Sequence, residues 1–153
     1  MLAGAAIGIS VNETPVVRAN AKPAFAPGFR LSALDVFILA IGGVAALALA
    51  MVVWWWGFVV GFVLGHFFLF CNVVRLARPL ELAWAGVFLA LAAGTVALGV
   101  PGWPVTASVS LVATVVVVRV EMRKPSYHGL AWQWINPGLP AWWEARKAES
   151  GGG

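Results

Sequence analysis

Charged residues and cysteines are scarce in this sequence. Asp, Glu, Lys and Arg make up only 10% of the 153 residues, whereas a soluble domain carries about 25%. Cys71 is the single cysteine, which excludes an internal disulfide and a multi-cysteine metal site. Two histidines and one cysteine, scattered along the chain, do not make a zinc site. No paired carboxylates or nucleophile–base pair occur at bilayer depth, so we expect no catalytic or metal-binding residues and no enzyme.

Long apolar segments fill the middle of the chain, and 61% of all residues are hydrophobic. A transmembrane helix needs roughly 20 mostly apolar residues. The run from Val36 to Val74 is about twice that length, and it is best divided at Trp54–Gly57, because tryptophan prefers the membrane interface. The pattern predicts an all-α integral membrane protein, a bundle of four transmembrane helices in two hairpins. The predicted spans cover about residues 33–53, 56–75, 80–98 and 104–118.

Short local patterns mark the ends of these spans. Ser32 and Asp35 form a capping box before the first span. Pro79 suits the first turn of the third helix, and Gly99–Pro104 is a turn by composition. The fourth span is rich in valine, but its surroundings favour a helix over a strand. The predicted organisation is a cytoplasmic arm over residues 1–30, a transmembrane domain over 31–121 and an interfacial tail over 122–153. The arm does not resemble a signal peptide, because it lacks a positive start and a long apolar stretch.

The positions of the positive charges predict the topology. Neither of the two hairpin tips, Trp54–Gly57 and Gly99–Trp103, contains a charge, and all ten Lys and Arg residues fall in the other three segments. Cytoplasmic loops carry the excess of Lys and Arg. We therefore expect both termini in the cytoplasm of a bacterium and the four spans in its inner membrane. The net charge of +4 follows this topology and does not indicate nucleic acid.

Small residues recur at helical spacing in the predicted spans. Such rows let helix backbones approach closely inside lipid, although some rows arise by chance. A neighbouring helix of the same chain and another subunit are both possible partners. The expected helix-packing residues are Gly57, Gly61 and Gly65 in the second span and Gly86, Ala90 and Gly94 in the third, with similar rows in the first span (Gly42, Ala46, Ala50) and the fourth (Thr106, Ser110, Thr114).

His66 is the main functional candidate, because it lies near the middle of the second span. Ionisable residues at that depth are costly and are often functional. One interpretation is a neutral histidine that makes an interhelical hydrogen bond to a Ser or Thr of the fourth span. Another is a cofactor-binding residue, an axial ligand to haem or to a chlorophyll-type pigment. A third is a proton or quinone site, which lacks a second ionisable group at the same depth.

Polar residues gather between the second and third spans. Asn72, Arg75, Arg78 and Glu81 would form a polar clasp that fixes the turn, with Arg78 and Glu81 close enough in sequence to pair. The alternative is an anionic lipid head-group or phosphate site. Nearby Cys71 is expected to be a small buried residue.

Four tryptophans lie among prolines and glycines of the tail. Aromatic residues beside basic ones are typical of the bilayer interface, so the tail is expected to lie on the inner membrane surface. The alternative is docking of a partner, because tryptophan dominates binding hot spots. The anchoring residues are Trp132, Trp134, Trp142 and Trp143, and Gly151–Gly153 is expected to be flexible.

The second hairpin resembles that of small bacterial multi-span membrane proteins of unassigned function. The likeness covers about residues 57–130. It includes the run from Gly65 to Val73 and the Tyr127-His128-Gly129 segment after the last span, together with Arg75, Arg78, Glu81-Leu82 and Trp84. The resemblance supports the hairpin interpretation and implies no activity.

Three functions fit these features. The first is a non-catalytic accessory or scaffold subunit of a larger respiratory or photosynthetic complex, in contact with membrane lipids and with other membrane subunits or itself. The second is a haem- or pigment-binding protein with His66 as ligand. The third is a small self-associating transporter, although its spans offer little polar lining for a water-filled path.

Overall fold

The computed structural model describes residues 26–151, and all regular structure in that range is helical. The elements in chain order are α1 (Ala33–Val52), α2 (Trp54–Phe68), the π-helix η1 (Leu69–Val74), α3 (Arg78–Leu98), α4 (Trp103–Met122), α5 (Trp132–Ile135) and α6 (Leu139–Gly151). Most of the predicted arm, and the last two glycines, lie outside the described residues. Four segments are long and apolar enough to cross a membrane, namely α1, α2 with η1, α3 and α4. The helical class is therefore confirmed, as is the prediction of four helices long and apolar enough to span a membrane.

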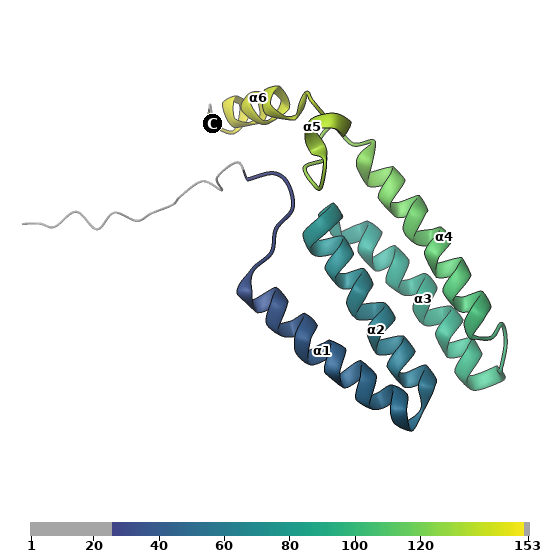
Figure 1. Cartoon of the computed structure of the whole chain (residues 1–153). Coiled ribbons are helices and arrows are strands. Elements are labelled where there is room, and N and C mark those ends of the chain that lie inside the picture. The colour runs from purple at the N-terminus through teal and green to yellow at the C-terminus, as the bar shows by residue number, and fades with distance from the viewer. Residues whose placement is uncertain (1–25, 152–153) are drawn as a thin grey trace, which may run out of the picture.

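The four long helices form two hairpins (Figure 1). Helix α1 packs against α2, and α3 packs against α4. The core lies between α2 with η1, α3 and α4, where Phe70, Trp84, Phe88 and Val117 are buried. Helix α1 contributes no buried residue. The bundle is thus a three-helix core with α1 attached along one side.

Local chemistry explains where the helices begin and end. The Ser32 hydroxyl accepts from the Asp35 amide at 3.2 Å, and the Asp35 carboxylate accepts from the Ser32 amide at 2.8 Å. This reciprocal pair confirms the predicted capping box. Val53 alone separates α1 from α2 in an extended conformation. Pro79 lies in the first turn of α3, and Gly99 ends that helix with a φ of 71°.

Two predicted helix ends differ from the structure. Helix α4 continues to Met122 instead of ending near residue 118, because Arg119 and Glu121 extend it beyond the apolar segment. The second span ends in a six-residue π-helix, and Arg75 closes it in a left-handed conformation with a φ of 57°. The amide of Leu76 then returns to Phe70 O at 2.8 Å. Hydropathy gives the length of an apolar segment. It reports neither charged residues that continue a helix nor a change in the number of residues per turn, so neither feature was predicted.

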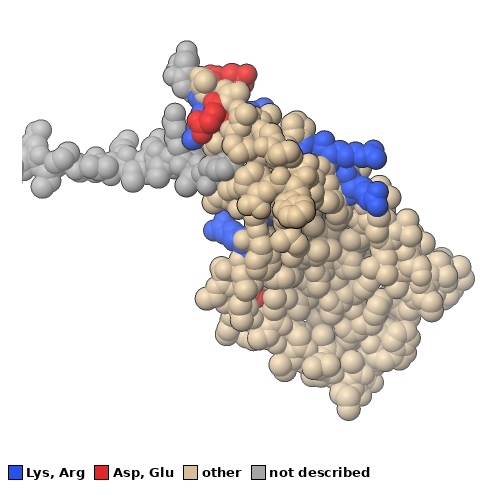
Figure 2. Space-filling view, turned by 45° about the horizontal axis from the view of Figure 1, so that its top comes forward, with Lys and Arg blue, Asp and Glu red and all other residues tan. Residues whose placement is uncertain are grey.

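Charges are concentrated at one end of the molecule. Figure 2 shows the Lys and Arg side chains near the tail, while the opposite part of this face is uncharged. The uncharged end carries aromatic rings instead. Trp55 stacks on Trp103 with centroids 5.4 Å apart, and Trp54 lies edge-on to Trp103 at 6.4 Å. The two hairpin tips therefore meet through tryptophans.

The small-residue rows differ in what they contact. A Cβ on Gly57 would overlap Ala46 O and the Ala50 side chain, and one on Gly61 would touch the Ala46 side chain at 3.7 Å. The rows of α1 and α2 thus meet at this end of the hairpin. Gly42 lies against the Leu64 side chain, which a Cβ would approach at 2.6 Å.

Other small residues do not face a neighbouring helix. A Cβ on Gly65 or Gly86 would meet no described atom within 4 Å, and Ala90 is exposed. Gly94 lies against the turn, where a Cβ would come within 2.9 Å of Val100 O. The predicted contact face of the third span therefore meets no other described helix, because α3 turns its aromatic side, with Trp84 and Phe88, toward α2 and α4.

We expect Gly57→Ala to destabilise the α1–α2 hairpin, because its new methyl group overlaps backbone and side-chain atoms of α1. The cost of such overpacking is about 1–3 kcal/mol. Gly65→Ala is the matched control, since the same methyl group enters open space on the same helix. Unfolding of each variant in mixed detergent micelles measures the difference. Equal stability of the two variants would show that the Gly57 contact does not limit helix approach.

Candidate functional site

His66 lies among aromatic rings in the core between α2 and α3. Its ring stacks on Trp84, with centroids 4.4 Å apart and planes at 18°, and lies 4.3 Å from the Phe62 ring. Phe70 approaches edge-on at 5.7 Å. The residue is only 8% exposed. These contacts fix the orientation of the imidazole.

The two ring nitrogens of His66 have different surroundings. Nδ1 lies 2.7 Å from the backbone oxygen of Phe62. Because a carbonyl only accepts, Nδ1 carries a proton in this hydrogen bond, and Nε2 is the nitrogen that can offer a lone pair. Among residues 26–151, no group donates a hydrogen bond to Nε2. A histidine with Nδ1 bound to a backbone carbonyl is oriented to coordinate a metal through Nε2.

Trp84, rather than His66, makes a side-chain hydrogen bond to Ser110 and Thr114 of α4. The indole Nε1 of Trp84 donates to Ser110 O at 3.0 Å and to Thr114 Oγ1 at 2.8 Å. The expected bond from His66 to a Ser or Thr of the fourth span is therefore wrong. A buried tryptophan usually finds a partner for its N–H. The position of Trp84 within the predicted third span was therefore the feature of the sequence that indicated this bond.

The polar row on α4 faces α3. Thr106 and Ser110 are fully buried, and Thr106 Oγ1 lies 2.8 Å from Thr95 Oγ1. The hydroxyl groups of Ser110 and Thr114 also donate to backbone oxygens one turn earlier. Every hydroxyl of this row thus has a hydrogen-bond partner, as burial in a bilayer requires.

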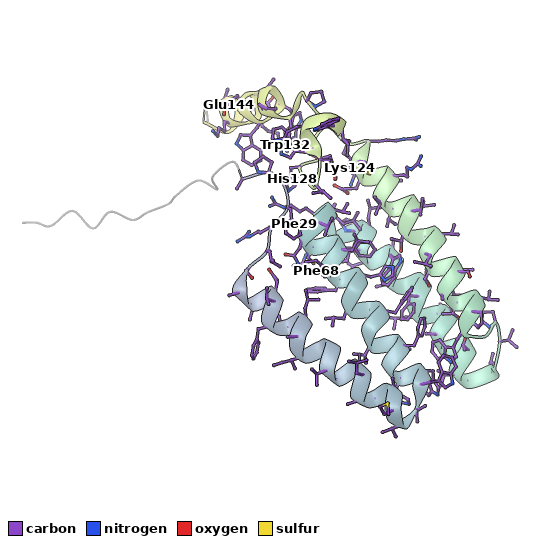
Figure 3. The ribbon with its side chains drawn as sticks, in the orientation of Figure 1. Phe29, Phe68, Lys124, His128, Trp132 and Glu144 are labelled. Atoms are coloured by element: carbon purple, nitrogen blue, oxygen red, sulfur yellow. The ribbon has the colours of Figure 1, made fainter. Side chains whose placement is uncertain are left out.

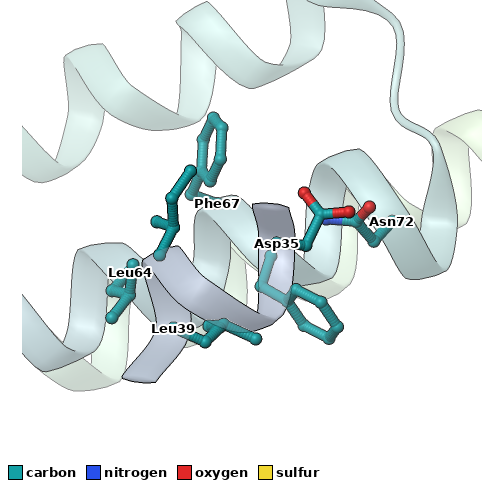
Figure 4. A pocket seen from close by; sticks show the side chains of 7 residues that line it. Asp35, Leu39, Leu64, Phe67 and Asn72 are labelled. Atoms are coloured by element: carbon teal, nitrogen blue, oxygen red, sulfur yellow. The ribbon is translucent and has the colours of Figure 1, made fainter. Parts of the chain in front are cut away.

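The four predicted clasp residues do not form one cluster. The side-chain amide nitrogen of Asn72 faces two acceptors. It donates to Arg30 O at 2.9 Å and to Asp35 Oδ2 at 3.2 Å. Figure 4 shows Asn72 and Asp35 side by side on neighbouring helices. Arg75 Nη1 instead donates to Ala26 O at 2.6 Å. Asn72 therefore connects η1 to the start of α1, and Arg75 holds the arm.

Arg78 and Glu81 differ from the prediction. Between the described residues, the ion pairs are Lys124–Glu121 and Lys147–Glu144, so Arg78 and Glu81 do not pair. Cys71, expected to be buried, is exposed and lies 3.9 Å from Glu81 Oε1 through its Sγ atom. The π-turn alters the angular spacing of residues along this segment, so faces inferred from a regular α-helix do not apply here.

Three segments meet at the end of η1, and we call them the charged-end junction: residues 26–30, 72–75 and 127–130. Two carbonyls of η1 accept amides from outside the helix, Asn72 O from Arg30 N at 3.2 Å and Val73 O from Leu130 N at 2.8 Å. The two outer segments are also joined, because Gly28 N donates to His128 O at 2.8 Å. The junction thus satisfies backbone groups that a helix end leaves open.

Side chains close the same junction. Tyr127 is buried, and its hydroxyl donates to Leu130 O at 2.8 Å. Burial, and then the Glu121 carboxylate, raise the pKa of Tyr127 above its ordinary value, so the donor proton is retained at neutral pH. A Cβ on Gly129 would overlap Val74 O. Phe29 of the arm lies edge-on to Phe68 at 6.3 Å, below His128 in Figure 3.

Glu121 is a second functional candidate that the sequence analysis missed. It is 4% exposed, and its Oε2 accepts from the Ala77 amide at 3.2 Å and from Lys124 Nζ at 2.6 Å. The carboxylate thereby caps the start of α3, where a negative charge is favoured. The signal was its spacing, because Glu121 continues the face of Thr106, Ser110, Thr114 and Val117.

The predicted anchoring tryptophans occupy different positions in the tail. Trp134 is 89% exposed, whereas Trp132 lies beside Gly28 of the arm. Trp142 and Trp143 follow buried Leu139 on α6, and the Arg146 guanidinium lies 5.2 Å from the Trp142 ring. The tail therefore folds over the charged end of the bundle through α5 and α6 (Figure 1).

Metal-binding groups and similarity to known proteins complete the description of the site. Among residues 26–151, no group of three or more His, Cys, Asp or Glu side chains could hold a metal ion. No protein-family model, curated protein or solved structure matches the chain. The resemblance to small bacterial multi-span membrane proteins therefore stays a prediction.

Proposed function

We propose that the chain is a multi-pass protein of a bacterial inner membrane, with both termini in the cytoplasm. The support is the separation of charge along the molecule, because the two hairpin tips carry none and the described Lys and Arg residues occupy the other end. Positive charges favour the cytoplasmic side. Tryptophans at the tips suit the opposite interface.

Within that membrane, we propose a non-catalytic accessory or scaffold subunit of a larger complex. The carrying observation is the small-residue face of α3. Gly86 and Ala90 are exposed, and a Cβ on Gly86 would meet no described atom within 4 Å. Small residues allow the close helix approach on which association in lipid depends. Helix α1, with no buried residue, offers a second apolar surface for the same partners.

Purification from the native membrane in mild detergent tests the accessory role. We expect larger membrane subunits at fixed stoichiometry, and we expect Gly86→Leu to lose them, because the added side chain fills the open face of α3. Gly65→Leu serves as the control, since it adds the same side chain at an open position of α2, outside the two proposed partner surfaces. A wild-type protein that purifies alone would contradict the proposal.

A second candidate function is the binding of haem or a chlorophyll-type pigment by His66. The favouring observation is the hydrogen bond that fixes the Nδ1 proton and leaves the Nε2 lone pair for a metal. The rings of Phe62 and Trp84 lie against the imidazole and hold its orientation for a ligand at Nε2. When bound, the cofactor would supply electron transfer or light absorption, which no side chain of this core provides.

An absorbance spectrum of the purified protein tests this second function. We expect a visible band that His66→Ala removes and that His128→Ala leaves unchanged. His128 is the matched control because it lies outside the four spans, with Nδ1 2.9 Å from Ser126 O. A colourless wild-type protein from its native membrane would exclude a pigment at His66.

A further inference from the structure

The segments that carry Arg30 and Arg75 meet where the chain leaves the apolar segments. Arg30 precedes α1 by three positions, and Arg75 follows directly after the second span. Their segments are joined, since the Arg30 amide donates to Asn72 O at 3.2 Å. In the membrane orientation proposed above, on which this inference rests, both residues lie at the depth where phospholipid head groups meet the hydrocarbon.

The positive charges of these arginines are not matched by carboxylates. The ion pairs formed by described residues involve neither Arg30 nor Arg75. Asp35 is the nearby acid, but its Oδ2 atom already accepts from Ser32 Oγ at 2.7 Å and from the Asn72 amide at 3.2 Å. Burial, and then the positive charge of Arg30, lower the pKa of Arg75 below its ordinary value. The two like charges thus repel each other unless an anion joins them.

The backbone at Arg75 supports a role for its side chain. Its φ of 57° places it in the left-handed region, where glycine or asparagine is favoured at a helix end. A long cationic side chain thus occupies a position that backbone geometry alone would not give it. It is held by one bond to Ala26 O, which leaves other guanidinium donors for a ligand.

We infer that the guanidinium groups of Arg30 and Arg75 bind a phosphate group, of the kind carried by an anionic phospholipid. The planar arginine fork matches the oxygen atoms of phosphate, and basic pockets at this depth bind anionic head groups. The ligand would bridge the arm and η1. This site differs from the predicted clasp, because it includes Arg30 and excludes Asn72 and Glu81, whose polar atoms face other groups.

Thermal unfolding of the full chain in detergent, with added lipid, tests this site. We expect phosphatidylglycerol to raise the Tm and phosphatidylcholine to have a much smaller effect. Arg30→Gln should weaken phosphatidylglycerol binding by roughly tenfold or more, as expected for lost charge-assisted hydrogen bonds. The Arg30 side chain makes no hydrogen bond to the described residues, so this variant is expected to fold. Arg75→Asn is the second variant, because asparagine tolerates the left-handed backbone.

Arg119→Gln is the matched control, since it removes the same charge from an exposed position of α4 near the same end. Retained lipid stabilisation in the control, with loss in Arg30→Gln, supports the site. Inorganic phosphate is added in a separate experiment. A rise in Tm with phosphate that Arg30→Gln also removes would support the site and identify a soluble anion as its ligand. Equal loss in Arg119→Gln, or no loss in Arg30→Gln and Arg75→Asn, would overturn the inference.

Discussion

The exclusion of charge and of unpaired backbone groups from four long apolar segments is the constraint on which this structure depends. A single segment can satisfy it as a helix, with its backbone hydrogen bonds made internally, as a bilayer interior would require. The four long helices meet this condition, and the buried hydroxyl groups of α4 bond to α3 or to their own backbone. Turns between helices then carry the remaining polar groups. The chain places its aromatic turns at one end and its charged segments at the other.

The π-helix links the core to the charged end. It follows the turn that holds His66, and π-turns inside helices are frequent at functional sites. Its end would leave carbonyls open, and the arm and the Tyr127–Leu130 segment donate to them from two sides. Residues far apart in the sequence are therefore joined around Asn72 and Val73. Binding at either the His66 ring or the charged-end junction would stabilise the same segment of the second span.

Much of the fold was accessible from the sequence, because apolar length, the Ser32–Asp35 capping box and Pro79 each act locally. The candidate site was less accessible. His66 was identified by its depth, but the bond of Trp84 to α4 depends on which faces meet, and hydropathy does not encode this. The role of Glu121 depends on the last turn of α4, which lies beyond the predicted span. The exposure of Cys71 depends on the π-turn, which the apolar pattern does not show. The Gly86 row matched a packing pattern, but no described atom lies within 4 Å of a Cβ at Gly86.

Single-cysteine labelling tests the proposed orientation most directly. In a Cys71→Ser background, Val100→Cys places a thiol at an uncharged tip, and Ala148→Cys places one on α6, both at exposed positions. A membrane-impermeant maleimide added to spheroplasts should label the Val100→Cys protein, whereas the Ala148→Cys protein should react only after the membrane is opened. The opposite pattern would reverse the topology. Labelling of both proteins from outside would contradict the proposed arrangement of four spans with a cytoplasmic tail.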